Sequence, residues 1–480
     1  MDKIFERIQP EPFRIKTVTP IKMLTSEERK AIIQAVHYNV FKIKSEDIFI
    51  DLITDSGTTA MSDNQWSAMM KGDESYASAS SWFKLEASLK DIFGYNYVLP
   101  AHQGRGAENI LFTTMIKKGQ TVPNNMHFSP DRVTASGGIM ANLIIEEGKD
   151  LQNEHPFKGN INIEKLLALI EKVGADHIPF IMITVTCNNA GGQPVSMENI
   201  RAVRAVADKY KLPVILDAAR IAENAQFIKM REAGYGNKSI KEIIRETCSY
   251  SDGCVASSKK DGMVNIGGFV GINDEKLYEI MQSYCLMWEG YLTYGGMAGR
   301  DLEALAVGYQ EGIDEHYLQY RIGQSQYLAQ KLQEENVPIA LPAGGHGVWI
   351  DSKKFCPHIP PEEYPGIAIT TALYIEGGIR GCELGNLAFS KRNEETGEIL
   401  QLPEVDLVRL ALPRRVYTSR HLDYIAAVAG EVYRNNQKLE GFKVKKYATI
   451  KYRTLFLGQM EPVEKALSNS PESKIKQVAD

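Results

Sequence analysis

The sequence predicts an α/β protein built on a mostly parallel sheet, with a second, smaller α+β domain. Three observations in the middle of the chain lead to this fold class. HIPFIMITVT, near residue 180, is a short apolar run typical of a buried strand, and the turn-rich loop NNAGGQPVS follows it. SMENIRAVRAVADKY then places apolar residues on one helical face, and LPVILD returns to a strand. Strand, helix and strand in this order form a crossover unit, which requires parallel strands.

The remaining elements follow in order along the chain. Residues 25–41 begin with a Thr-x-x-Glu capping box and continue with apolar residues at helical spacing, which predicts a helix. Beyond about residue 320, helical stretches such as RIGQSQYLAQKLQEEN alternate with short strands such as HGVWID and VRLALP. We therefore expect an N-terminal arm with part of the small domain at 1–60, a large domain at 61–315 and a small domain at 316–480. The last of these ends in the polar segment SNSPESKIKQVAD.

Composition narrows the class of protein. The chain has 480 residues, of which 44% are hydrophobic and 24% charged, as in ordinary soluble globular proteins. A net charge of −5 argues against a nucleic-acid partner. The N-terminus has no apolar signal-peptide core and the chain has no long apolar run, so we expect no membrane partner and a cytoplasmic location. The six cysteines show no C-x-x-C spacing, which favours reduced core or site-lining thiols over disulfides or a zinc site.

Charged residues stand where two predicted strands end. Asp217 closes VILD, with Arg220 three residues later, and the pair Lys259 and Lys260 follows the apolar residues of GCVASS. Ligands of open parallel sheets gather at the carboxyl ends of strands. A lysine that binds the cofactor covalently and an acid that keeps its ring nitrogen protonated are what pyridoxal phosphate chemistry needs. Either feature alone is also common in solvated loops, and it is their combination that favours the cofactor.

Further blocks carry a resemblance to a known family. VTCNNAGGQPVS, DAARIAENAQFIK, SSKKDGMVNIGG, AHQGRGAEN, DLITDSGT, GDESY, YGGMAGRD and ALPRRVYT resemble the tryptophanase and tyrosine phenol-lyase family of β-eliminating carbon–carbon lyases. These blocks extend from about residue 50 to residue 420. The resemblance implies a fold type I pyridoxal phosphate enzyme. It also implies a homotetramer, a dimer of dimers, whose active sites borrow residues from the neighbouring subunit.

The resemblance implies a set of cofactor-binding residues. Lys260 is the covalent cofactor lysine and the base that removes the α-proton. Lys259 is either a cationic neighbour that helps to keep the Lys260 amine neutral or a merely solvated lysine. The other expected contacts are Gln103, Gly104, Arg105 and Ser257 to the phosphate, Phe128 stacked on the ring, Asn188 and Arg220 to the ring's phenolic oxygen, and Asp217 to the ring nitrogen.

Substrate and cation sites are carried over in the same way. Arg409 matches the arginine that binds the substrate carboxylate, for which a planar bidentate group is suited. Tyr76 matches the tyrosine that protonates the leaving group from across the subunit interface. Glu74, Asn265 and the backbone of Gly57 match oxygen ligands of a potassium ion. An interface salt bridge is the alternative role for Glu74.

The leaving-group pocket departs from both known members of the family. Ser129 keeps the hydroxyl of the phenol-lyase threonine, but Leu384 stands in place of the phenol-lyase arginine. Tyr452 aligns with the tryptophanase histidine, and Arg453 beside it is the cation we expect near the substrate ring. The other predicted pocket residues are Thr54, Phe41 and Tyr291.

The resemblance therefore implies elimination of an aromatic L-amino acid, as in tyrosine phenol-lyase, to an arene, pyruvate and ammonia. Tryptophanase activity, cleavage of S-substituted cysteines and an aldolase-like reaction remain open. A non-catalytic binding protein is disfavoured, because a decayed site should have lost some of Lys260, Asp217, Arg220, Arg409 and Tyr76.

Overall fold

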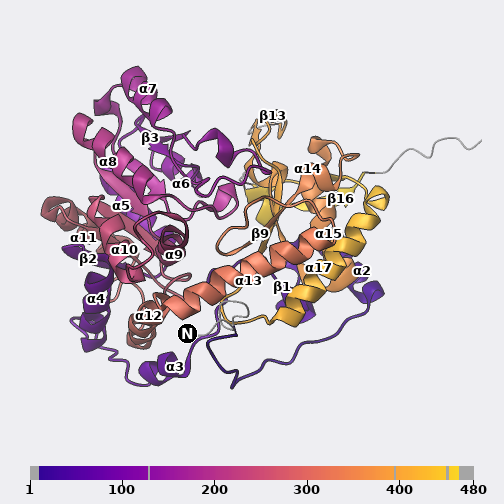
Figure 1. The fold of residues 1–480 in the computed structure, drawn as a ribbon, viewed down its shortest axis with the longest axis horizontal. Coiled ribbons are helices and arrows are strands. Elements are labelled where there is room, and N and C mark those ends of the chain that lie inside the picture. The colour runs from indigo at the N-terminus through magenta and orange to yellow at the C-terminus, as the bar shows by residue number, and fades with distance from the viewer. Residues whose placement is uncertain (1–9, 128–129, 394–395, 450–452, 464–480) are drawn as a thin grey trace, which may run out of the picture. The chain divides into compact units, whose positions relative to one another are not determined.

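The computed structural model describes residues 10–127, 130–393, 396–449 and 453–463. These residues form two compact units (Figure 1). The large unit contains residues 52–350, together with the chain up to Pro20 and the segment Arg409–Ala427. The small unit contains the intervening and following segments, which begin at Ile21, Asp351 and Val428.

Seven strands form the central sheet of the large unit, in the order β2-β8-β7-β6-β5-β3-β4. The neighbours from β7 to β4 all pair in parallel, which confirms the predicted mostly parallel sheet. β8 instead pairs antiparallel with β2 and β7, because the connection at residues 258–267 is too short for a parallel crossover. The strands are β2 (Tyr97–Ala101), β3 (Thr121–Asn124), β4 (Ile139–Asn142), β5 (Ile181–Thr184), β6 (Val214–Asp217), β7 (Gly253–Ser257) and β8 (Gly268–Ile272).

The predicted crossover unit is confirmed as β5, helix α8 (Met197–Tyr210) and β6, with the two strands paired in parallel. α8 begins where Ser196 caps it, because the Ser196 side chain accepts a hydrogen bond from the backbone N–H of Asn199. Its apolar residues Ile200 and Val203 are buried against the sheet. Burial of this face, rather than helix propensity alone, stabilises α8.

Helices cover both faces of the sheet, so the strands are apolar throughout. Ile181 and Ile183 pack into one hydrophobic core with helices α4, α8, α10 and α12, whereas Met182 packs into a second core with α5 and α11. Alternate side chains of a strand point to opposite faces, and here both faces are buried. The other helices of this unit are α3 (Asp63–Met69), α4 (Ser80–Phe93), α5 (Gly104–Met115), α6 (Pro130–Ala135), α7 (Ile163–Val173), α9 (Ile221–Arg231), α10 (Ile240–Ser249), α11 (Glu275–Trp288), α12 (Gly299–Gly312) and α13 (Glu315–Glu334).

The small unit is an α+β structure, as predicted for this part of the chain. β1 (Ile50–Asp51) pairs in parallel with β10 (Ile379–Arg380), and β15 (Phe442–Lys446) pairs antiparallel with β16 (Gln459–Pro462). The remaining elements are α2 (Ser26–Ala35), α14 (Ser352–Phe355), α15 (Pro365–Gly377), β11 (Cys382–Leu384), α16 (Asn386–Phe389), β12 (Lys391–Arg392), β13 (Ile399–Gln401) and α18 (Thr454–Leu457). Unit boundaries fall within or beside β9 (Gly347–Asp351), β14 (Leu407–Ala411) and α17 (Ser419–Arg434).

The predicted N-terminal helix begins at the expected capping box but ends early. The Thr25 side chain and Glu28 exchange the two capping hydrogen bonds in front of α2. The helix ends at Ala35 rather than near residue 41, because His37 and Tyr38 take positive φ angles of 53° and 55°. Such angles are incompatible with a continuing right-handed helix.

The division into units differs from the boundaries at 60 and 315 that the sequence predicts. Helix α13 belongs to the large unit, although all but its first residue lie beyond residue 315. The reason is a long-range contact: Arg321 of α13 donates hydrogen bonds to Glu223 of α9 and to the carbonyl of Leu412. Contacts between residues so distant in sequence leave no local pattern. The terminal polar segment lies outside the described residues.

Two expectations drawn from composition concern the cysteines and the membrane. All six cysteines lie in the described part of the chain, where they are buried and form no disulfide, as predicted. Among the described residues, no helix has the length and apolar character that spanning a membrane requires. The cytoplasmic location stays a prediction.

Candidate active site

The N-terminus of helix α5 forms a cradle beside the end of β7. Gln103 is the N-cap of α5, and its side chain makes no capping hydrogen bond to the helix. Gly104 follows, and a Cβ there would lie 2.5 Å from the Cβ of Ser257. Only glycine permits this approach of the helix to the strand end. A helix N-terminus packed against a serine is suited to bind a phosphate.

Two cations accompany this cradle. The pKa of Lys259 is lowered by burial and by the guanidinium of Arg105, so the two charges lie close to one another. The structure therefore brings Gln103, Gly104, Arg105, Ser257 and Lys259 together in one unit, as the cradle requires. Their roles in binding a phosphate stay predictions.

Lys260 lies just beyond β7 and is largely, but not fully, shielded from solvent. Burial lowers the pKa of Lys260 to about 8, with Arg220 as the next strongest cause. The anions Asp55, Asp217 and Glu108 act in the opposite direction. The cation that most favours a neutral Lys260 is thus Arg220, whereas the sequence suggested Lys259. The side chain of Lys259 runs over Gly57 instead, where an added Cβ would meet its Cε at 2.6 Å.

A buried ion-pair network holds Arg220. Asp55 is fully buried and accepts hydrogen bonds from Arg220 Nε at 3.0 Å and Nη2 at 2.6 Å. Arg414 donates to the same carboxylate at 3.0 Å and also to Glu223 at 2.8 Å. These guanidinium groups keep the pKa of Asp55 well below its usual range despite burial. The network fixes Arg220 beside the strand end that carries Asp217.

Asn188 and Arg409 are in direct contact. Asn188 Oδ1 accepts hydrogen bonds from Arg409 Nη1 and from His346 Nε2, both at 2.9 Å. Arg409 Nη2 donates to the carbonyl of Ile53 at 2.8 Å. Burial and nearby Arg220 hold the pKa of His346 well below its usual range, so its ring is neutral. Asn188, predicted to contact the cofactor, and Arg409, predicted to bind the substrate carboxylate, are therefore held by one set of hydrogen bonds.

Tyr76 lies on the surface of the large unit, with 69% of its area exposed. Its ring lies 5.4 Å from the ring of Tyr291 and 5.6 Å from that of Tyr294. Tyr294 raises the pKa of Tyr76, so the phenol keeps its proton at neutral pH. An exposed, protonated tyrosine is suited to act on a neighbouring subunit, but that role stays a prediction.

The predicted cation ligands form two groups within the chain. Asn265 Nδ2 donates to the carbonyl of Gly57 at 2.9 Å, so these two residues are neighbours. Glu74 instead accepts hydrogen bonds from the backbone N–H of Gly299 and Arg300 at the start of α12 and pairs with the Arg300 side chain at 3.2 Å. This salt bridge lies within the chain, so both predicted roles of Glu74, as a cation ligand and in an interface salt bridge, stay predictions.

The remaining predicted pocket residues lie in both units. Phe41 packs edge-to-face against Phe456 of α18, with ring centroids 4.8 Å apart, and Arg453 is the N-cap residue of α18. Both belong to the small unit, as does Leu384, which is buried at the end of β11. In the large unit, Thr54 accepts a hydrogen bond from the N–H of Ser56. Three predicted residues lie outside the described residues: Phe128, Ser129 and Tyr452.

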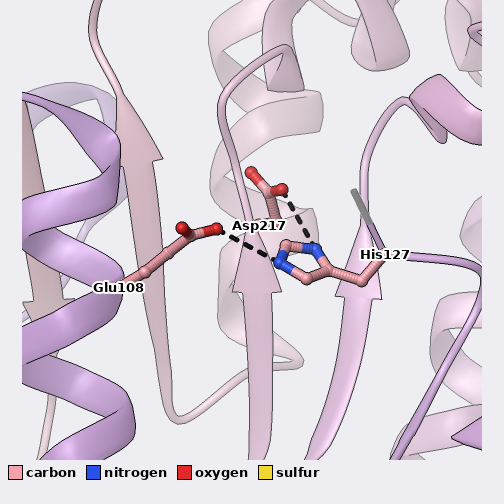
Figure 2. Close-up of side chains that lie close together, drawn as sticks. All are labelled: Glu108, His127 and Asp217. Carbon is pink, nitrogen blue, oxygen red and sulfur yellow. Dashed lines mark hydrogen bonds and ion pairs between the residues drawn. The ribbon is translucent and has the colours of Figure 1, made fainter. Parts of the chain in front are cut away.

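The sequence missed one group of charged residues beside Asp217. His127 lies between Glu108 and Asp217, and its two ring nitrogens face the two carboxylates (Figure 2). Glu108 and His127 are separated by 19 positions in sequence and come from different elements, so no motif spacing connects them. Glu108 does lie in the quoted block AHQGRGAEN, which could have drawn attention to it.

Comparison with known proteins identifies the family. Residues 51–428 match the β-eliminating lyase family. The chain belongs to this family. It is 48% identical to the tyrosine phenol-lyase of Nostoc punctiforme over 436 residues, which cover 90% of this chain and 93% of the relative. It is also 48% identical to the tryptophanase of Salinibacter ruber over 417 residues, which cover 86% of this chain and 88% of the relative. The predicted carbon–carbon lyase family is thus confirmed.

The fold is also that of a solved enzyme. Serine palmitoyltransferase from S. paucimobilis, with bound pyridoxal phosphate and myriocin, superposes with a TM-score of 0.58 at 13% identity. The match covers 86% of this chain and 97% of that chain. This likeness confirms the predicted fold type I architecture.

Proposed function

We propose that this protein is a pyridoxal phosphate-dependent lyase that eliminates the side chain of an aromatic L-amino acid, as the name tyrosine phenol-lyase describes for its relatives. The products are the arene, pyruvate and ammonia. The observation that supports this most is Lys260, whose pKa is about 8 and which lies in one unit with Asp217, Arg220 and Arg409. Such an amine is partly neutral at pH 7 and can act as a nucleophile and a base.

The residues present fit the cofactor. The close packing of Gly104 on Ser257 forms a cradle at a helix N-terminus, with Arg105 and Lys259 as its cations. Asp217 supplies the anion for a protonated ring nitrogen, and Asn188 and Arg220 supply donors for the ring oxygen. Once bound, pyridoxal phosphate withdraws electrons from the α-carbon of an amino acid.

The reaction then depends on where this chain moves protons. Lys260 takes the proton from the α-carbon. Arg409, held by Asn188 and the carbonyl of Ile53, binds the substrate carboxylate through its guanidinium. An aryl carbanion is too unstable to leave, so the ring carbon must be protonated before the bond to Cβ breaks. Tyr76 of a neighbouring subunit supplies this proton.

The identity of the leaving group rests on a pocket that differs from both relatives. Leu384 replaces the arginine expected to bind a phenolic oxygen, and it is 5% exposed in the small unit. Arg453, in the same unit, is the cation we assign to the substrate ring. Release of indole, as the tryptophanase relative would imply, and of a thiol from an S-substituted cysteine are the alternatives.

A substrate panel tests the proposal. The purified protein, supplied with pyridoxal phosphate and potassium, should release pyruvate from L-tyrosine, with phenol as the second product. Pyruvate mainly from L-tryptophan or from S-methyl-L-cysteine would support the corresponding alternative. No pyruvate from any of the three would contradict the proposed function.

Exchange of Arg453 tests the assignment of the leaving group. Arg453→Ala should slow tyrosine cleavage by roughly 10- to 150-fold, the value of one charge-assisted hydrogen bond felt in the transition state. Elimination from S-methyl-L-cysteine should change little, because a thiolate leaves without ring protonation. Lys446→Ala, at an exposed position in β15 of the same unit, is the matched control. Equal loss on both substrates would show that Arg453 is structural.

Further parts of the proposal are a homotetramer and a potassium ion held by Gly57, Asn265 and Glu74. The homotetramer is carried over from the family resemblance, in which Tyr76, 69% exposed here, acts on a neighbouring subunit. Analytical ultracentrifugation at micromolar concentration should give about four times the chain mass of 53.6 kDa. The cytoplasmic location belongs to the same proposal.

A further inference from the structure

His127 connects two carboxylates through opposite edges of its ring (Figure 2). Nε2 lies 3.1 Å from Oε1 of Glu108, which projects from α5, and Nδ1 lies 3.4 Å from Oδ2 of Asp217 at the end of β6. The imidazole side chain is fully buried. The backbone N–H of His127 donates to Asn124 Oδ1 at 2.7 Å, which fixes the loop after β3. The ring is therefore held in place at both ends.

Glu108, His127 and Asp217 are residue types that can bind a metal ion, but their arrangement does not suit one. Their ligand atoms lie within 4.8 Å of one another, the only such group among the described residues. One metal ion, however, binds only one nitrogen of an imidazole. Here each carboxylate faces a different nitrogen, so the histidine itself occupies the place between them. A ring that is hydrogen-bonded to Glu108 and ion-paired with Asp217 explains this geometry better than coordination.

The charges around the ring favour its doubly protonated form. Glu108 and Asp217 are anions, and Arg132 of α6 pairs with the second oxygen of Glu108 at 3.1 Å. A ring protonated at both nitrogens places a positively charged N–H toward each carboxylate, whereas a neutral ring leaves one nitrogen without a proton. Burial lowers the pKa of His127, but Glu108 and Asp217 outweigh burial and Arg132, so the pKa is raised above its usual value.

A neutral ring is the competing arrangement. Thr184 of β5 has its hydroxyl oxygen 3.0 Å from Nδ1, and it could donate to an unprotonated nitrogen. Glu108 would then still accept from Nε2–H. In that case the ring would present no N–H to Asp217 and would carry no positive charge to attract its carboxylate. The two arrangements differ in what they do to Asp217.

We propose that doubly protonated His127 is a positioning residue, which directs the carboxylate of Asp217 toward the ring nitrogen of the cofactor, with Glu108 as the anion that anchors it. The inference rests on the proposed function, because it assumes that Asp217 meets a pyridine nitrogen. An ionised Asp217 holds that nitrogen protonated, which is the state that accepts electrons. His127 thus acts on the reaction through Asp217.

The test is cofactor affinity, measured by equilibrium dialysis with the full-length chain. The probes are pyridoxal phosphate and its analogue in which a CH group replaces the ring nitrogen. His127→Gln should weaken binding of pyridoxal phosphate about tenfold or more, because it removes the cation that holds the Asp217 carboxylate in place. The analogue cannot pair with Asp217, so its affinity should change less than about twofold. Combining His127→Gln with Asp217→Asn should weaken pyridoxal phosphate binding no further than Asp217→Asn alone.

The control variant is His177→Gln, which removes a histidine at 3.2 Å from a carboxylate, Asp176, but on the surface. It should leave both affinities unchanged. Equal weakening of both probes by His127→Gln would show that His127 only maintains the fold, and no weakening of either would show that the ring is neutral. Both results would overturn the inference. Failure of the wild-type chain to bind either probe would instead contradict the proposed function.

Discussion

The lowered pKa of Lys260 predicts a reactive amine, and substitutions of its charged neighbours should raise or lower that pKa. With a pKa of about 8, roughly one amine in ten is neutral at pH 7, which is about 200-fold more than for an ordinary lysine. The rate of labelling by an amine-specific reagent should therefore rise with pH and level off above pH 8. Lys260 should label faster at pH 7 than exposed lysines such as Lys117.

Two substitutions should shift this behaviour in opposite directions. Arg220→Gln removes the strongest cationic cause of the low pKa. If the pKa of Lys260 rises by one unit, the neutral fraction of the amine at pH 7 falls about ninefold. Asp217→Asn removes an anion that favours the protonated amine. If the pKa of Lys260 falls by one unit, the neutral fraction of the amine at pH 7 rises about fivefold, because it then reaches about one half.

Mass spectrometry of the peptide that carries the lysine pair measures both rates in the cofactor-free chain. Fragmentation separates the label on Lys260 from that on Lys259, and Lys117 in the same digest is the internal control. The two variants should change the Lys260 rate in opposite senses and leave Lys117 unaffected. A change in the same direction for both variants, or none in either, would refute an electrostatic origin of the low pKa.

Three further predictions concern the cradle, the ion-pair network and the cation. Gly104→Val should weaken binding of pyridoxal phosphate at least about tenfold, measured by dialysis, because its Cβ would start 2.5 Å from that of Ser257. Asp55→Asn should lower the free energy of unfolding by about 3–5 kcal/mol, because it leaves buried guanidinium charge unpaired; urea unfolding checks this against Asp63→Asn, whose carboxylate is exposed and should matter little. Pyruvate release should be faster in potassium than in sodium at matched ionic strength, and equal rates would count against the proposed cation site.

Local patterns predicted the parts of this protein that local physics determines. The crossover of β5, α8 and β6 follows from apolar periodicity and from the Ser196 cap, and both are visible in a short window of sequence. The capping box of Thr25 and Glu28 located the start of α2 for the same reason. Asp217 and Lys260 could be placed at strand ends, because strands of this length have recognisable limits.

The rest depends on contacts between distant segments. Asp55 and Arg220 are 165 positions apart, and nothing in either segment indicates that the two charges are buried together. The same holds for His127 and Glu108. α13 joins the large unit through Arg321, which no composition shift signals. The end of α2 was missed because positive φ angles at His37 and Tyr38 are rare for such residues.

The measurement that tests the central claim most directly is the identity of the lysine that holds the cofactor. The full-length chain is incubated with pyridoxal phosphate, reduced with borohydride so that the bound cofactor stays on its amine, digested and mapped by mass spectrometry. The label should be on Lys260, and Lys260→Ala should carry none, whereas Lys259→Ala should still be labelled at Lys260. A label on Lys259 in the wild-type chain, or no label at all, would contradict the assignment of this site.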